Sequence, residues 1–205
     1  MNIAARLIVS ARSPFGRRVR IAAHRLAFPH GVELVDVFAP PLWLRSLNPL
    51  GQIPVLEVGP GEALVDSPAI LEHLHEWSRE RGGVGLWPAD SAGRLSTRMA
   101  SVMAAGVMTS TVTAFVESTR HVVPDDWTAE HRQNIEGCLK WLQDRPETLW
   151  SGATLTQPGC DTAVALEYLD LRVPELNWRS RYLTLNRVVE EARKLPLFVE
   201  TTPKA

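Results

Sequence analysis

Two serine–proline pairs, Ser13-Pro14 and Ser67-Pro68, stand where a strand-like run of residues gives way to a helical pattern. Serine is a favoured helix N-cap and proline is favoured at the first helical position, so capping alone explains both pairs. The same helix ends carry partial positive charge and unpaired N–H groups, which stabilise an anion placed there. Each pair is therefore a candidate anion site, for a thiolate at Ser13 and for a carboxylate at Ser67.

Two further features extend these candidate sites. If Ser67 and the helix N–H groups hold an α-carboxylate, Asp66 beside them can hold the neighbouring α-ammonium group. Pro54 opens a strand after Ile53, where a trans bond is the default. A cis bond would turn the backbone of Ile53 outward, to pair with an extended peptide-like ligand. A ligand that offers a thiolate, a peptide backbone, an α-carboxylate and an α-ammonium group is glutathione.

The elements that must position these residues alternate along the first 80 residues. Apolar runs and alternation predict strands at 7–9, 32–37, 54–58 and 62–65. Apolar positions at helical spacing predict helices at 15–26, 43–47 and 67–77. The expected order is β-α-β-α-β-β-α, with both serine–proline pairs at helix starts. Arg17, Arg18 and Arg20 are expected on a solvated face of the first helix.

Residues 81–91 are rich in glycine and proline and predict a linker between two domains. No convincing strand follows them, and apolar stripes at helical spacing continue to residue 195. The stretch 162–166 is apolar nearly all round, which is typical of a central buried helix. The sequence thus predicts an α/β domain at 1–80 and an all-helical domain at 92–205.

Composition argues against several other functions. Twenty-two basic residues balance 23 acidic ones, so no net field indicates nucleic acid or an anionic membrane as a partner. No apolar run is expected to reach the roughly 20 residues of a membrane span. His73 and His75 lie two positions apart on one predicted helix, so they face differently and no metal site is expected. Cys138 and Cys160 are expected to be buried, reduced thiols, which favours a cytoplasmic location.

The sequence resembles the cytosolic glutathione transferase family, and in particular bacterial members with a serine-type active site. The resemblance is carried in the first domain by residues 13–15, 19–22, 48–56 and 66–70, and in the second by 168–172 and 174–178. It implies a thioredoxin-like domain followed by an all-helical bundle. It also implies a homodimer with one glutathione site in each subunit.

Carried over residue by residue, the resemblance places Ser13 at the catalytic position. It implies that Phe15 presents its backbone near the glutathione cysteine. Ile53 would pair its backbone with the cysteinyl unit, next to a cis Pro54. Asp66 and Ser67 would hold the γ-glutamyl end. Glutathione would act as a co-substrate, without a metal ion.

A serine at this position leaves the glutathione thiol as the nucleophile, because serine cannot form the mixed disulfide that cysteine-type members use. A free thiol has a pKa near 8.5, so only a few per cent is thiolate at pH 7. Lowering that pKa by about two units requires roughly 2.7 kcal/mol, which an O–H hydrogen bond and a helix end can supply. The expected activity is conjugation of glutathione to small electrophiles. A glutathione-dependent isomerase or reductase and a non-catalytic interaction module are the alternatives.

Two expectations concern the second domain. In the family the second substrate lies against the first helix of this domain, where Met103 and Met108 can supply a plastic apolar surface; core packing is the alternative. Family members usually carry serine or threonine three residues before the aspartate that opens the buried helix. Here Pro158 stands three residues before Asp161. We expect this helix to lack that hydroxyl cap, at a cost of about 1 kcal/mol.

Overall fold

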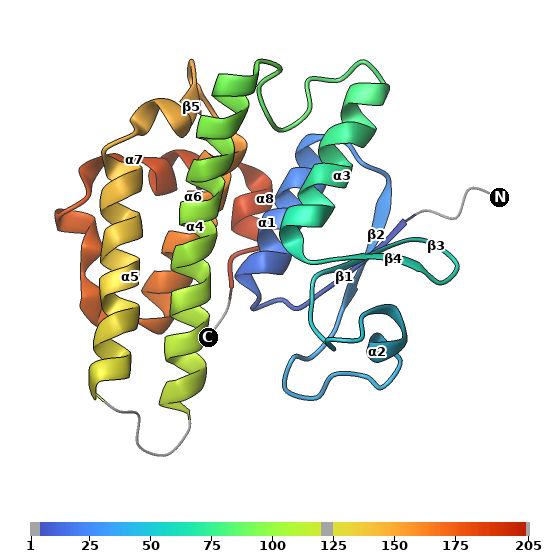
Figure 1. Ribbon diagram of the computed structural model, residues 1–205, viewed down its shortest axis with the longest axis horizontal. Coiled ribbons are helices and arrows are strands. Elements are labelled where there is room, and N and C mark those ends of the chain that lie inside the picture. Colours follow the sequence, from blue (N-terminus) through green and yellow to red (C-terminus); the bar gives the residue numbers. More distant parts are fainter. Residues whose placement is uncertain (1–4, 120–124, 204–205) are drawn as a thin grey trace. The chain divides into compact units, whose positions relative to one another are not determined.

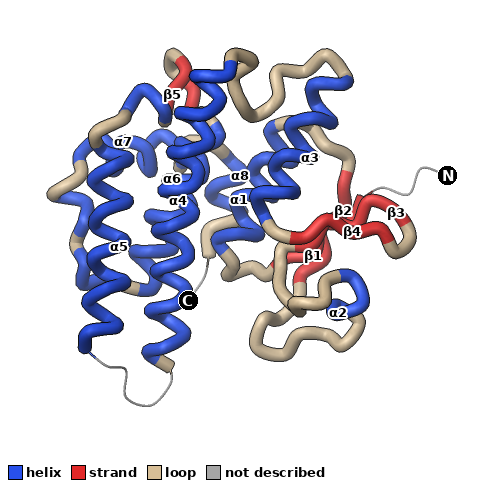
Figure 2. Tube along the Cα trace, viewed as in Figure 1, coloured by secondary structure: helices blue, strands red, loops and turns tan. Residues whose placement is uncertain are grey.

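The computed structural model describes residues 5–119 and 125–203. The chain forms two compact units, Met1–Trp87 and Pro88–Pro203. The division falls within the stretch 81–91 that the sequence indicates as a linker. The first unit combines a sheet with helices, whereas the second is mostly helical (Figures 1 and 2).

The first unit is built on a four-stranded mixed sheet in the order β2-β1-β3-β4. β1 pairs in parallel with β2 and antiparallel with β3, and β3 pairs antiparallel with β4. This confirms the predicted thioredoxin-like order β-α-β-α-β-β-α. The elements are β1 (Ala5–Val9), α1 (Pro14–Arg25), β2 (His30–Leu34), α2 (Leu44–Leu47), β3 (Val55–Gly59), β4 (Glu62–Val65) and α3 (Ser67–Glu80).

Both faces of this sheet are covered, because successive side chains of a strand point to opposite faces. Leu7 and Val9 of β1 belong to a core that includes residues of α1 and α3, among them Val19 and Leu74. The intervening Ile8 packs instead with residues that include Leu44 of α2. Figure 1 shows the same arrangement, with α1 and α3 together on one side of the sheet and α2 on the other.

α1 approaches β1 closely at one glycine. A Cβ atom on Gly16 would lie 2.9 Å from the Cβ of Val9, which is closer than real side chains pack. Gly16 therefore lets the start of α1 lie directly on the sheet. The prediction that Arg17 and Arg18 lie on a solvated face of this helix is wrong, because each is only 3% exposed. The reason is that α1 buries residues around most of its circumference, so it has little solvated face.

β2 differs from the prediction in both position and burial. It runs from His30 to Leu34 rather than over 32–37, and Val32 and Leu34 are 44% and 59% exposed. The reason is that β2 is an edge strand, so its side chains have neighbours on one side only. The chain stays beside β1 for one more residue, because the N–H of Val35 donates to the carbonyl of Val9 at 2.8 Å.

The second unit packs its long helices against one another. α4 contacts both α5 and α6, and α6 also contacts α7. Every residue of α6 from Gln157 to Leu169 is buried, which confirms the predicted central helix. The helices are α4 (Ser91–Ser118), α5 (Asp125–Gln143), α6 (Gln157–Arg172), α7 (Leu183–Ala192) and α8 (Pro196–Glu200), with short 3-10 turns at Pro146–Thr148, Pro174–Leu176 and Trp178–Ser180.

Two features of this unit correct the sequence analysis. A small hairpin joins β5 (Trp150–Ser151) to β6 (Thr154–Leu155), so the unit is not entirely helical. Strands of two residues are too short to show alternation in the sequence. α6 also has a hydroxyl cap, because Thr156 accepts a hydrogen bond from the N–H of Gly159 at 3.2 Å. The hydroxyl of Thr156 also donates to the carbonyl of Thr148 at 2.7 Å. The helix therefore has a hydroxyl cap at Thr156, although Pro158 occupies the position where the family usually has one.

The expectation that no apolar run approaches the length of a membrane span is wrong for α4. By length and composition alone it is apolar enough to cross a membrane, because residues 99–116 contain no charged side chain. The core helix of a helical bundle passes the same test, and α4 packs against α5 and α6. This packing favours the core helix.

Candidate functional site

The sheet topology brings the candidate site residues to one end of the first unit. β1, β2 and β4 run in one direction and β3 runs in the other. Val55, the first residue of β3, consequently pairs with both Ile8 near the end of β1 and Val65 at the end of β4. The segments that carry Ser13, Ile53, and Asp66 with Ser67 all continue from this end of the sheet.

Ser13 is the N-cap of α1. Its Oγ accepts a hydrogen bond from the N–H of Gly16 at 3.1 Å, and its backbone is extended, with φ −76° and ψ 122°. A hydroxyl that accepts one hydrogen bond still carries its own hydrogen and can donate it. Ser13 can therefore cap the helix and donate to an anion at the same time. Phe15 lies in the first turn of α1, where backbone N–H groups lack helical partners.

Ser67 places a buried hydroxyl at the start of α3. The residue is 1% exposed, and no residue within 5–119 or 125–203 gives its Oγ a hydrogen bond. A buried polar atom without a partner costs about 1–3 kcal/mol. A ligand atom that hydrogen-bonds to this hydroxyl would offset that cost. The burial fits the predicted carboxylate site.

Asp66 has a strained backbone. Its φ is +69° and its ψ is 134°, in a region that side-chain-bearing residues rarely adopt. Such strain costs on the order of 1–3 kcal/mol and is concentrated in proteins at ligand-binding sites. The Asp66 side chain is exposed and makes no capping hydrogen bond to α3. Its carboxylate is thus available to a ligand beside Ser67.

Ile53 and Pro54, the third candidate segment, follow a loop that is held in place by the buried side-chain amide of Asn48. The Ile53–Pro54 peptide bond is cis. Asn48 is 2% exposed; its Nδ2 donates to the carbonyl of Gln52 at 2.7 Å, and its Oδ1 accepts from the N–H of Leu50 at 3.1 Å. In the sequence Asn48 stands out only as part of the segment 48–56 that carries the family resemblance, and this positioning role was not predicted. The sign in the sequence is an asparagine directly before Pro-Leu-Gly.

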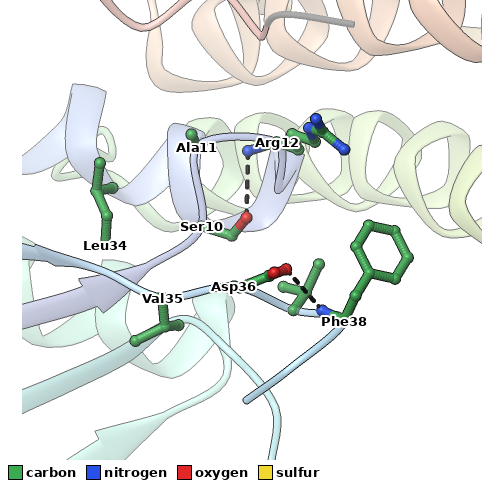
Figure 3. Close-up of a pocket in the computed structure, with 8 residues that line it drawn as sticks. Ser10, Ala11, Arg12, Leu34, Val35, Asp36 and Phe38 are labelled. Atoms are coloured by element: carbon green, nitrogen blue, oxygen red, sulfur yellow. Dashed lines mark hydrogen bonds between the residues drawn. The ribbon is translucent and has the colours of Figure 1, made fainter. Parts of the chain in front are cut away.

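A hollow of about 360 Å³ opens at the same end of the sheet. One wall is the turn Ser10–Arg12 and the other is the stretch 34–38, which begins at the last residue of β2 (Figure 3). The turn is held by two hydrogen bonds to Ser10, from the N–H of Arg12 to Oγ and from the N–H of Ser13 to the carbonyl, both 3.3 Å long. The wall therefore ends at Ser13. No signal in the sequence predicts this hollow.

The methionines expected at the second-substrate site lie in packed positions. Met108 is 0% exposed, and Met103 is half-buried with its Sδ 4.0 Å from the Sγ of Cys138 on α5. Met108 therefore presents no surface to a substrate, and for this residue the core alternative holds. The reason is that α4 packs against both α5 and α6, so one apolar stripe of this helix is buried in the core. A second-substrate role for Met103 stays a prediction.

Other reactive groups do not gather into a site. Within the described ranges, no three histidine, cysteine, aspartate or glutamate side chains are placed to hold a metal ion. Cys138 and Cys160 are both reduced thiols, not joined in a disulfide. Burial raises the pKa of the Cys138 thiol, which lowers its reactivity. The chemistry of the first unit is thus concentrated at the end of the sheet.

Comparison with known proteins agrees with this placement. The family model of the glutathione S-transferase N-terminal domain matches residues 12–77, a range that contains every candidate residue of the first unit from Ser13 to Ser67. The rice (Oryza sativa subsp. japonica) protein "Probable glutathione S-transferase DHAR1, cytosolic" is 32% identical over 63 residues. That match spans 31% of this chain and 30% of the rice protein.

Solved structures match over nearly the whole chain. A glutathione S-transferase from Methylobacterium radiotolerans, in complex with glutathione sulfonate, is 29% identical with a TM-score of 0.89, covering 98% of this chain and 95% of its own. A maleylacetoacetate isomerase from Anaeromyxobacter dehalogenans, with glutathione in its active site, is 26% identical with a TM-score of 0.76 and the same coverage. The fold and the sequence agree: residues 12–77 match the glutathione S-transferase N-terminal domain, and nearly the whole chain is similar to solved glutathione S-transferases.

Proposed function

We propose that this protein conjugates the thiol of glutathione to small electrophiles, with Ser13 stabilising the thiolate. The observation that carries the proposal is the hydrogen bonding of Ser13, whose Oγ accepts from Gly16 and keeps its hydrogen to donate. A charge-assisted hydrogen bond to a thiolate is stronger than one to a neutral thiol, so it favours ionisation. The partial positive charge at the start of α1 acts in the same direction.

The remaining residues would hold the rest of glutathione. Ser67 and the first N–H groups of α3 would bind the α-carboxylate, and Asp66 would bind the α-ammonium group. The backbone of Ile53 would pair with the cysteinyl unit beside Pro54, and the backbone of Phe15 would lie near its sulfur. Among the described residues the buried hydroxyl of Ser67 has no hydrogen-bond partner, which supports this placement, because a bound carboxylate would give it one.

The reaction balances without a further cofactor. With an aryl halide, the thiolate sulfur attacks the carbon that bears the halogen, a C–S bond forms, and the C–halogen bond breaks. The halide ion leaves, and the proton of the thiol passes to solvent. Ser13 keeps its own proton throughout, since it donates a hydrogen bond rather than transferring a proton.

A glutathione-dependent isomerase is the second candidate function. The match to the maleylacetoacetate isomerase favours it, because that protein also holds glutathione in its active site. The glutathione site would be the same, but the sulfur would add to the substrate and then leave again. A panel of aryl halides and cis-alkene substrates separates the two activities, since a transferase consumes glutathione and an isomerase does not.

We also propose a homodimer that works in the cytoplasm. Leu95, Met99 and Val102 lie at helical spacing on α4 and are 66%, 39% and 56% exposed, which leaves an apolar stripe uncovered. A second copy would cover it. Sedimentation should give twice the chain mass, and Val102→Glu should shift the equilibrium toward monomer. A wild-type protein that sediments as a monomer would contradict the dimer.

Calorimetry of the wild-type protein with glutathione tests the proposed function as a whole. We expect one site per chain, together with consumption of glutathione when an aryl halide is added. A protein that binds no glutathione would instead be a non-catalytic interaction module. A protein that binds glutathione but converts only cis-alkene substrates would be an isomerase.

A further inference from the structure

The hollow beside Ser13 contains one positive and one negative side chain among its eight lining residues. Arg12 is exposed, and its guanidinium makes no hydrogen bond or ion pair with any residue in the described part of the chain. Asp36 lies on the opposite wall, and its Oδ1 accepts a hydrogen bond from the N–H of Phe38 at 2.9 Å (Figure 3). The hollow therefore offers a cation that has no partner and a carboxylate that is already engaged.

The rest of the hollow is largely apolar and open to solvent. Leu34, Val37 and Phe38 are 59%, 43% and 67% exposed. Covering such side chains with an apolar ligand is favourable in proportion to the area removed from water. A flat or aliphatic body of a few carbon atoms would contact this wall while a charged end reaches Arg12.

We propose that this hollow binds the electrophile and that Arg12 selects electrophiles that carry a carboxylate on an apolar body. Arg12 and Ser13 are consecutive, so their Cα atoms are about 3.8 Å apart. A substrate whose carboxylate lies on Arg12 thus has its body beside the group that holds the thiolate. The guanidinium fork binds a carboxylate with two parallel hydrogen bonds, which fixes orientation as well as charge. The inference rests on the proposed function, because it assigns the second substrate of that reaction.

Asp36 provides a second test, because its charge should act on the substrate in the opposite sense to that of Arg12. A carboxylate in the hollow repels an anionic substrate, so Asp36 opposes the selection that Arg12 makes. Removing its charge should strengthen the preference for anionic electrophiles. Asparagine keeps an oxygen that can still accept from Phe38, so the turn can be preserved while the charge is lost.

Two aryl chlorides that differ only in charge test the inference. 4-Chloro-3-nitrobenzoate and 4-chloro-3-nitrobenzamide share the ring, the nitro group and the leaving chloride. Each kcat/KM is divided by the uncatalysed rate of the same chloride with glutathione, which removes their different reactivity. We expect the wild-type protein to prefer the benzoate by about tenfold, the scale of one partly desolvated charge pair.

The variants should move this preference in opposite directions. Arg12→Gln should reduce it to about onefold, and Arg12→Lys should keep part of it, since the positive charge remains. Asp36→Asn should raise it by a few fold. Arg81→Gln removes an exposed arginine at the end of α3, outside the hollow, and should leave it unchanged. The KM for glutathione should stay the same in Arg12→Gln.

Binding of the finished conjugates separates this inference from the proposed function. Calorimetry compares the glutathione conjugates of the two ring systems with glutathione itself, and it needs no turnover. Tighter binding of the benzoate conjugate, lost in Arg12→Gln, supports the inference. Equal binding of both conjugates would overturn it while the transferase function stands, and so would an Arg12→Gln variant that loses affinity for glutathione itself. A wild-type protein that binds neither glutathione nor a conjugate overturns both.

Discussion

The Oγ of Ser13 accepts a hydrogen bond from the N–H of Gly16 at 3.1 Å, so the residue that caps α1 keeps its own hydroxyl hydrogen to donate. Gly16 also allows a close approach to β1, since a Cβ atom at this position would lie 2.9 Å from the Cβ of Val9. One glycine thus connects the packing of the helix on the sheet to the position of the serine hydroxyl.

Replacing Gly16 with alanine should destabilise the protein. The new Cβ would lie 2.9 Å from the Cβ of Val9, and such overpacking costs about 1–3 kcal/mol, against about 1 kcal/mol gained in helix propensity. Urea unfolding of both proteins measures the difference. Gly137→Ala is the matched control, because outside the neighbouring residues of α5 no atom of the described chain lies within 4 Å of its new Cβ, and it should stabilise by about 0.5–1 kcal/mol. Equal gains in the two variants would contradict the close packing.

Replacing Ser67 with alanine should separate binding from stability. The hydroxyl is buried and has no hydrogen-bond partner within residues 5–119 and 125–203, so its removal should leave the ligand-free protein as stable as the wild type or more stable. Affinity for glutathione should fall about tenfold, the scale of one hydrogen bond to a carboxylate. Ser101→Ala is the contrast, because Ser101 donates to the buried Asp161 and its loss should destabilise the protein. A Ser67→Ala variant that unfolds early and binds glutathione normally would reverse the assignment.

Replacing Thr156 with alanine should destabilise the protein by about 1–2 kcal/mol. The variant loses both the cap on Gly159 and the hydrogen bond to the carbonyl of Thr148. Thr156→Ser keeps both groups and should remain within about 0.5 kcal/mol of the wild type. Thermal unfolding of the three proteins decides the matter, and an unchanged alanine variant would show that α6 does not need this cap.

Stability should fall at alkaline pH through Tyr182. Burial, and then the hydrogen bond of 2.6 Å that its hydroxyl donates to Glu136, raise the pKa of Tyr182 to about 12. Since the folded state holds this proton more tightly than the unfolded state, the contribution is complete below about pH 10 and is lost as pH rises toward 12. Unfolding followed across this range should show a steeper decline for the wild type than for Tyr182→Phe. Parallel declines would contradict the coupling.

Local signals in the sequence were enough for most of the elements of the first unit. The serine–proline pairs, the helical spacing and the strand patterns each depend on a few neighbouring residues, and α1, α3, β3 and β4 appear where these signals place them. Features set by distant packing were missed. The burial of Arg17 and Arg18, the exposure of β2 and the loss of Met108 to the core all depend on which elements become neighbours.

The features of the candidate site likewise include some that depend on local sequence and others that depend on the folded chain. Residue type and order were enough to propose Ser13, Ile53, Asp66 and Ser67 as site residues, because helix starts and turns are local. The positive φ of Asp66 and the missing partner of the Ser67 hydroxyl are properties of the folded chain and have no signature in the sequence. The hollow between residues 10–12 and 34–38 likewise exists only because β1 and β2 are parallel neighbours.

The central claim is that Ser13 lowers the pKa of the bound glutathione thiol. Titrating the ultraviolet absorbance of the thiolate in the binary complex measures this directly. We expect a thiol pKa about two units below its ordinary value of about 8.5 in the wild type, a similar value in Ser13→Thr, and a value about 1–2 units higher in Ser13→Ala. A Ser13→Ala complex that titrates at the wild-type pKa would contradict the account.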